Sequence, residues 1–243
     1  MSTFNPIFYY NIITASFKNF LVAAYKLSNA TDSYNGYNGV AGNAVVFNST
    51  NAVDGNAGQF INAVNSRISI ADNNAFSFTT GTTDMPFSIK ANINISTLGA
   101  TNIIFCKYSG ALNNTSEYVF YVNTANKLAL ILFDKNAGGV YIGARISGTV
   151  IANTQYNVVG TYDGSGSWTG IKLYINGTLQ SLTALNNGTP YTSMGNTTTQ
   201  QTIGNASNFA APFRGTIDEC YIFNKELSQS QVTTLQTNYY PNI

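Results

Sequence analysis

Alternating side chains near the C-terminal end of the chain predict a β-strand followed by a short helix. Residues 216–223 alternate with a period of two, as expected for a strand in a packed sheet. One face would carry Ile217, Glu219, Tyr221 and Phe223, and the other Asp218, Cys220 and Ile222. Ser228 is placed to cap a helix whose apolar side is Val232 and Leu235.

The clearest strand pattern lies at Phe87–Ile95. Its odd-numbered residues are apolar and form a core face, whereas Ser88, Lys90 and Asn92 form a polar face that we expect to be available at the surface. Residues 117–122 and 128–132 are apolar at nearly every position, which predicts central strands covered on both faces. The expected buried core includes Ile89, Ile93, Val119, Leu130, Val158, Leu173 and Ile217.

Short strands separated by turn-rich loops continue along most of the chain. Asn-Gly pairs in residues 32–39 and at Asn176–Gly177 suit tight turns with positive φ. Residues 185–201 form a long Asn/Thr/Gly segment of a length at which loops tend to be functional. Helix is expected only after Ser228. The predicted fold is therefore all-β, a two-sheet antiparallel jelly-roll sandwich with a short C-terminal helix.

Several segments resemble laminin-G-like domains of the concanavalin A-like lectin/glucanase superfamily. The pattern G-x-I-D-E-x-x-I-F-N-x-x-L-S at residues 215–228 resembles their closing strand. LVAAYKLSNATDSYNGYNG (21–39), MPFSIKANINI (85–95), IFCKY (104–108), YNVVGTYDG (156–164), IKLYINGTL (171–179) and TIGN (202–205) resemble further family segments. The tryptophan and histidines of the family's "WHHV" motif are absent, which indicates a distant member. These motifs indicate fold more than function.

Composition narrows the function classes. Charged residues are only 9% of the 243, well below the roughly 25% of an average globular protein. A formal net charge of +1 gives no electrostatic support for binding nucleic acid or an anionic membrane. No apolar run is long enough for a membrane span, so no membrane insertion is expected. The two cysteines, Cys106 and Cys220, are predicted to be buried thiols, with a cross-strand disulfide as the alternative.

Catalysis is not expected. The chain contains no histidine, which excludes Ser-His-Asp and Cys-His nucleophile systems. Glycosidases need two carboxyl groups that flank one bond. The superfamily's glucanases carry an E-x-D-x-x-E strand motif that this sequence lacks, and the adjacent acids Asp218 and Glu219 would point to opposite faces of a strand.

The resemblance implies a structural Ca²⁺ site where the opening loop meets the closing strand. By position, Asp32 and Asp218 match the family's acids, and the carbonyl groups near Asn35 and Gly36 would add oxygen ligands. The alternative is that Asp32 caps its turn and Asp218 accepts hydrogen bonds from backbone amides.

A sugar-binding role is favoured by aromatic residues at loop tips among many amide side chains. Aromatic rings stack on the apolar faces of sugars, and Asn, Asp and backbone groups bond the hydroxyls. The candidates are Tyr34, Tyr37, Trp168 and Tyr191, each of which could equally pack within the domain. The expected partner is a glycan or another cell-surface ligand.

We expect two parts, an N-terminal arm at residues 1–20 and the jelly-roll domain at 21–243. The arm concentrates apolar and aromatic residues and shows no secretory signal. It would either pack on its own domain as an extra strand or dock onto a partner, which would be another virion protein or a second copy of this chain.

The Asn/Thr/Ser/Gly-rich, charge-poor composition favours a phage or viral decoration or fibre protein at the virion surface. A secreted or cell-surface bacterial adhesin domain and a purely structural capsid-associated protein are the alternatives.

Overall fold

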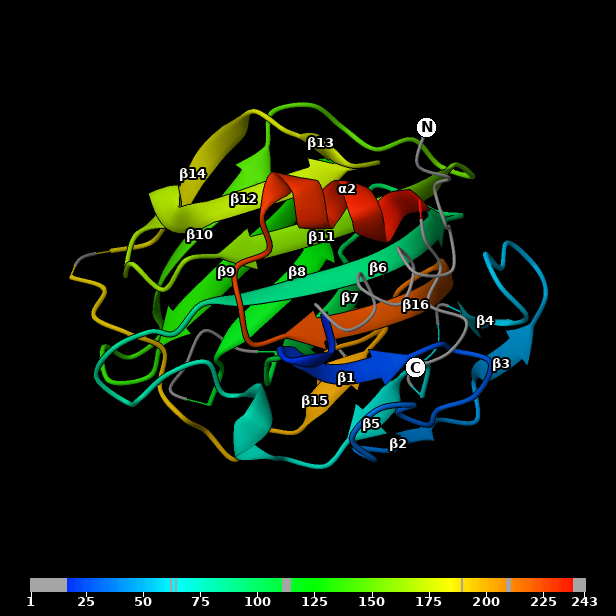
Figure 1. Cartoon of the computed structure of the whole chain (residues 1–243), viewed down its shortest axis with the longest axis horizontal. Helices are drawn as coiled ribbons and strands as arrows, with labels where there is room; N and C mark the ends of the chain where they lie inside the picture. Colours follow the sequence, from blue (N-terminus) through cyan, green and yellow to red (C-terminus); the bar gives the residue numbers. More distant parts are fainter. Residues whose placement is uncertain are drawn as a thin grey trace, which may run out of the picture.

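Two antiparallel sheets form the protein in the computed structural model, which describes residues 17–61, 63, 65–110, 115–188, 190–208 and 211–237. The sheets lie face to face as two layers, with one helix across the outside of the first (Figure 1). The predicted all-β jelly-roll sandwich is confirmed. Residues 1–16, most of the predicted N-terminal arm, lie outside the described residues.

Sheet A has a central path of seven strands. Their order is β13 (Thr178–Leu179), β12 (Ile171–Ile175), β11 (Gln155–Tyr162), β6 (Phe87–Ile95), β16 (Gly215–Phe223), β4 (Ala57–Phe60) and β3 (Val45–Asn48). β1 (Leu21–Tyr25) also pairs with β16. The opening and closing strands of the domain therefore lie next to each other.

Sheet B contains eight strands. Their order is β14 (Leu182–Asn186), β10 (Val140–Ile146), β9 (Leu128–Asp134), β8 (Tyr118–Val122), β7 (Asn102–Lys107), β15 (Gln201–Ile203), β5 (Ile68–Ile70) and β2 (Gly39–Ala41). Two 3₁₀ turns, η1 (Asn74–Phe76) and η2 (Trp168–Gly170), lie in the connections.

The main core fills the space between the two sheets. It includes Ile89 and Ile93 of β6, Leu130 of β9, Val158 of β11 and Ile217 of β16, none of which is exposed. The predicted core is confirmed with one refinement: Val119 is buried, but it belongs to a cluster on the outer face of sheet B.

A bulge corrects the predicted faces of the closing strand. The pairing of β16 with β6 shifts between Asp218 and Tyr221, and Glu219 has a φ of 51°, in the left-handed region. The extra residue reverses the alternation, so Ile217 shares the inner face with Cys220 and Ile222 rather than with Tyr221 and Phe223. The expectation that the adjacent acids Asp218 and Glu219 lie on a regular strand was therefore wrong.

The polar face of β6 is covered rather than available. Ser88 accepts a hydrogen bond from the Leu227 amide and donates one to the Lys225 carbonyl, in the segment that leads to the helix. The Lys90 ammonium donates to the Glu219 carbonyl and lies 4.8 Å from the centre of the Tyr221 ring. The polar face of β6 that was predicted to lie at the surface is thus buried inside the protein.

Helix α2 (Gln229–Thr237) covers part of the outer face of sheet A, as Figure 1 shows. Ser228 caps it as predicted: its hydroxyl accepts from the Gln231 amide, and its own amide donates to the Gln231 side chain. Val232 and Leu235 are buried against β11 and β12 in a cluster that includes Val159 and Tyr174. No helix of the described chain has both the length and the apolarity needed to cross a bilayer.

Both cysteines are buried free thiols, so the disulfide alternative is excluded. Cys106 lies on β7, where its sulfur is 3.1 Å from the Thr202 hydroxyl, and Cys220 lies in the core on β16. The two residues belong to different sheets.

Candidate functional site

Strands β8, β9 and β10 of sheet B, and Tyr108 just after β7, place aromatic side chains on the outer face of the sheet. On β8 and β9, residues such as Phe120 and Leu130 point into the main core, and the alternate residues Val119, Tyr121 and Ile131 point outward. The outward residues form a separate apolar cluster, in which Val119 and Ile131 are buried and Tyr121 is half-buried.

This outer face is hollowed into a groove with a volume of about 320 Å³. Its apolar floor comes from β7, β8 and β9, and tyrosine rings stand around it. The lining residues are Thr101, Ile103, Tyr108, Gly110, Val119, Tyr121, Ile131, Phe133, Tyr141 and Ala211. We call this the sheet B groove.

Ring contacts fix the shape of the groove at one end. Tyr108 stacks on Phe133 with 5.2 Å between ring centres and 15° between planes. Tyr141 packs edge-on against the same Phe133, with 5.9 Å between ring centres and 67° between planes. Phe133 is 1% exposed and anchors the two tyrosines, whose rings remain half-buried at the surface. Such mutual packing holds the rings in position before a ligand arrives.

The phenol groups of the groove can act as hydrogen-bond donors. Burial raises the pKa of Tyr121 to about 12, with smaller contributions from Tyr141 and Tyr108, and burial also raises the pKa of Tyr108. These hydroxyls therefore stay protonated at neutral pH. A groove with apolar ring faces and neutral O–H groups suits a ligand that has both apolar faces and hydroxyls.

The groove tyrosines were not among the residues predicted from the sequence to bind a ligand. Residues 117–122 and 128–132 are apolar at nearly every position, which predicts coverage on both faces, and β8 and β9 are indeed buried except at the half-buried Tyr121. The available signal was the tyrosine at 121, together with Tyr108 and Tyr141 on the neighbouring strands. Recognising it requires the strand order and register that the structure supplies.

Asp32 holds its loop through four backbone amides. One carboxylate oxygen accepts from Ala24 (2.8 Å) and Tyr34 (2.9 Å), and the other accepts from Asn35 and Tyr37 (both 3.0 Å). A carboxylate offers about four lone-pair positions, so these bonds occupy all of them. This donor set fits a turn-organising residue and does not fit a calcium ligand.

The other predicted calcium ligands also have partners within the chain. Asp218 accepts from the amides of Val53 (2.7 Å) and Glu219 (2.9 Å), at the β16 bulge. Asn35 donates its side-chain amide to the Val22 carbonyl, and Gly36 takes a φ of 78° in the turn. In the described part of the chain, no group of three or more His, Cys, Asp or Glu side chains could hold a metal.

The four aromatic residues predicted to bind a ligand are half-buried and packed. Tyr34 lies against the cluster on the outer face of sheet A and donates its hydroxyl to the Lys18 carbonyl. Tyr37 meets Phe76 edge-on at 5.2 Å. Trp168, at the start of η2, packs against the main core.

Tyr191 belongs to a hydrogen-bond network that fixes the long loop after β14. Its hydroxyl and that of Tyr162 both donate to one oxygen of Asp84, and the Met194 amide donates to the other. The Thr192 amide donates to Asp134. Two buried carboxylates, Asp84 and Asp134, therefore hold in place the loop whose length predicts a function.

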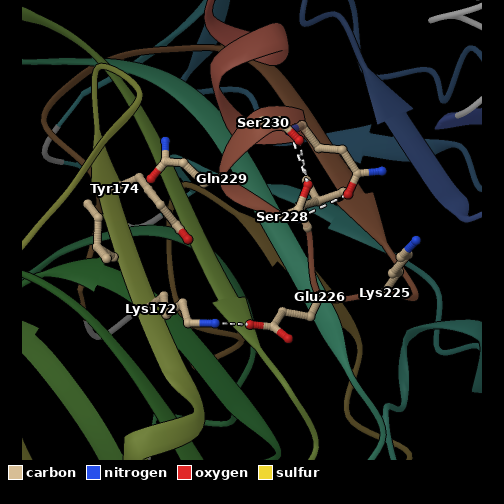
Figure 2. A pocket seen from close by; sticks show the side chains of 10 residues that line it. Lys172, Tyr174, Lys225, Glu226, Ser228, Gln229 and Ser230 are labelled. Carbon is tan, nitrogen blue, oxygen red and sulfur yellow. Dashed lines mark hydrogen bonds and ion pairs between the residues drawn. The ribbon is translucent and has the colours of Figure 1, made fainter.

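A second hollow, of about 660 Å³, lies between β12 and the start of α2. Figure 2 shows the Lys172 ammonium directed at Glu226, with 2.5 Å between nitrogen and oxygen. Ser228 and Ser230 bond to each other beside it, and Ser228 is already used as the helix cap. Because these polar groups satisfy one another, the sheet B groove is the better candidate site.

Three solved structures are similar to this chain in fold. The binding domain of Paraclostridial Mosquitocidal Protein 1 superposes with a TM-score of 0.63 and 17% identity, covering 93% of this chain and 53% of that one. The ligand-binding domain of botulinum neurotoxin serotype D, in complex with N-acetylneuraminic acid, superposes with a TM-score of 0.65 and 19% identity. The match covers 92% of this chain and 52% of that one. The chain thus spans about half the length of these toxin domains.

The third structure is similar over its whole length. Domain 4 of AbnA, an extracellular GH43 arabinanase from Geobacillus stearothermophilus in complex with arabinotriose, gives a TM-score of 0.62 and 18% identity, covering 90% of this chain and 98% of that domain. At these identities the similarity establishes the fold. No curated protein sequence matches the chain.

A family model supports the same conclusion from the sequence. It matches residues 62–233 and is described as the concanavalin A-like lectin/glucanases superfamily. The matched segment covers most of both sheets, including all the strands of the sheet B groove. The chain belongs to the concanavalin A-like lectin/glucanase superfamily.

Proposed function

We propose that this protein is a non-catalytic recognition module that binds a glycan in the sheet B groove. The observation that carries the proposal is the groove itself, where Tyr108, Tyr121 and Tyr141 surround an apolar floor. Aromatic faces would pack against the apolar faces of sugar rings, and phenol groups would bond their hydroxyls. Two solved structures of the same fold hold a sugar, which supports the ligand class.

The acidic residues support a role without catalysis. Asp218 and Glu219, the adjacent acids, are 0% and 1% exposed and belong to the bulge of β16 rather than to the groove. The described lining of the groove contains no carboxylate. A glycosidase would need two carboxyl groups beside the bond to be cleaved.

The test is a glycan-array screen of the purified protein, followed by titration of the best ligand against variants. Tyr121→Ala and Tyr141→Ala should each weaken binding by about tenfold or more, as expected when an anchoring aromatic residue is truncated. Tyr34→Ala removes a tyrosine on the opposite sheet and should leave affinity unchanged. Equal loss in all three variants, or loss only with Tyr34→Ala or Trp168→Ala, would contradict the assignment of the groove.

We infer that the module acts at the surface of a virus particle, as a decoration or fibre protein anchored through residues 1–20. The low charge and the Asn/Thr/Ser/Gly-rich composition support this proposal. A domain of a secreted or cell-surface bacterial adhesin is the alternative location, and it would use the same groove. A purely structural particle protein would bind no glycan on the array.

A further inference from the structure

Arg145 lies on the outer face of sheet B, in the same row as Tyr121. The register across the strands is Tyr121 on β8, Ala129 on β9, Arg145 on β10 and Thr183 on β14. Only a methyl group, that of Ala129, lies between the arginine and the tyrosine in this row. The arginine acts on the ring electrostatically, because its positive charge lowers the pKa of Tyr121 against the effect of burial.

The guanidinium group of Arg145 has no hydrogen-bond or ion-pair partner among the residues that the structure describes. Its Nε is buried without a hydrogen bond. The ion pairs in the described chain are Lys107–Asp72, Lys107–Glu117 and Lys172–Glu226. A guanidinium has five N–H donors in a planar fork that matches a carboxylate, and the one at the buried Nε is left unsatisfied here, which is costly.

A second cation, Lys127, adds to the positive potential near Arg145. Lys127 precedes β9 and, by alternation, projects on the same side as Ala129. Its ammonium donates to the Ile146 carbonyl (3.4 Å) and to that of Ser147. These neutral acceptors leave the charge uncompensated.

The nearest acid on β9 lies at the other end of the strand and is already occupied. Asp134 accepts from the amides of Asn136 (2.8 Å), Ala137 (3.1 Å) and Thr192 (2.7 Å). By alternation Asp134 lies on the inward side of β9, with Leu130 and Leu132, and so does not face Arg145 on the outer side. Arg145 does not line the sheet B groove itself but lies in the same row as its lining residue Tyr121, so a positive charge stands beside the groove.

We propose that the ligand of the sheet B groove is an acidic glycan whose sugar carboxylate pairs with the Arg145 guanidinium while a sugar ring packs on Tyr121. This inference rests on the proposed glycan-binding function and adds its chemical class. A carboxylate would satisfy two of the arginine's donors at once, which a neutral sugar hydroxyl does not do. Lys127 would add longer-range attraction for the same charge.

The experiment compares neutral, carboxylated and sulfated oligosaccharides of equal length by calorimetric titration. The carboxylated ligand should bind the unmodified protein most tightly, and its affinity should fall with added salt. Arg145→Gln should weaken its binding by about tenfold or more, since a hydrogen-bonded charge pair is lost, and should leave neutral ligands within about twofold. Arg145→Lys keeps the charge but loses the planar fork and should give an intermediate affinity.

Lys18→Gln is the matched control, because it removes one positive charge from an exposed residue that precedes β1 of the other sheet. It should change neither affinity nor ligand preference. Melting temperatures of all the variants establish that each is folded before binding is compared.

The possible outcomes separate the inference from the proposed function. Equal binding of neutral and carboxylated ligands, or equal loss of both in Arg145→Gln, overturns the acidic-glycan inference and leaves glycan binding intact. A preference for sulfated over carboxylated ligands also overturns the assignment of a sugar carboxylate. If no glycan binds the folded protein, both proposals fail.

Discussion

Glu219 shows how a single residue can combine backbone strain with a buried carboxyl group. Its φ of 51° places it in a region that costs a non-glycine residue roughly 1–2 kcal/mol. Its side chain is 1% exposed, and one carboxylate oxygen has no hydrogen-bond partner in the described chain. Burial raises the pKa of Glu219 to about 7, while the Lys90 ammonium acts in the opposite direction.

The raised pKa of Glu219 predicts a pH-dependent stability. In the unfolded chain a glutamate ionises near pH 4.5, whereas in the folded protein this one holds its proton up to about pH 7. Its favourable contribution is complete below pH 4.5 and is lost as the pH rises through about 7. The stability of the unmodified protein relative to Glu219→Gln should therefore fall between pH 5 and pH 7. Urea denaturation midpoints at both pH values measure this, and a constant difference would contradict the prediction.

At the scale of the element, sequence patterns located the strands better than their faces. The alternation at Phe87–Ile95 correctly identified the core side of β6, because each inward residue is apolar. The alternation did not show that two other parts of the chain cover the polar side of β6. These are the β16 bulge and the segment that precedes α2. The residue with positive φ in the bulge is Glu219, and because it is not a glycine, nothing in the sequence indicated that backbone conformation.

The opening loop is the element that the resemblance predicts to bind calcium. The four amide bonds to Asp32 give the loop its shape without an ion. We therefore expect a chelator to leave the melting temperature of the protein unchanged, and added Ca²⁺ to give no binding heat. Asp32→Ala should still destabilise the fold, because several buried or half-buried amides lose their acceptor. A chelator-induced fall in melting temperature would instead support the shared calcium site, since an ion bound only by the folded state stabilises it.

At the scale of the whole molecule, the fold could be predicted from the sequence and the candidate site could not. Segments such as residues 156–164 and 215–228 carry local motifs, so the family could be recognised without any long-range information. The sheet B groove depends on three tyrosines brought together by strand pairing across 34 residues of sequence, from Tyr108 to Tyr141. Loop-tip aromatics such as Trp168 matched a general expectation about lectins, but they pack against the core.

The boundary between the arm and the domain is also a property of the whole molecule. Phe17 is 2% exposed, and its ring centre lies 6.0 Å from those of both Phe20 and Phe223. The last residues of the predicted arm therefore belong to the hydrophobic cluster on the outer face of sheet A. Residues 1–16 are the part left to test as an anchor.

Two truncations separate anchoring from folding. Removing residues 1–20 deletes Phe17 and Phe20 from their cluster and should destabilise the domain by about 3–5 kcal/mol, the usual cost of truncating a buried phenylalanine. Removing residues 1–16 keeps that cluster and should leave the melting temperature within a few degrees of the full-length value. If the arm docks onto a second copy, light scattering should show an oligomer for the full-length protein and a monomer for the shorter truncation, with glycan affinity per site unchanged. A full-length monomer, or a 1–16 deletion that unfolds the domain, would show instead that the arm packs on its own sheet, and the anchoring proposal would fail.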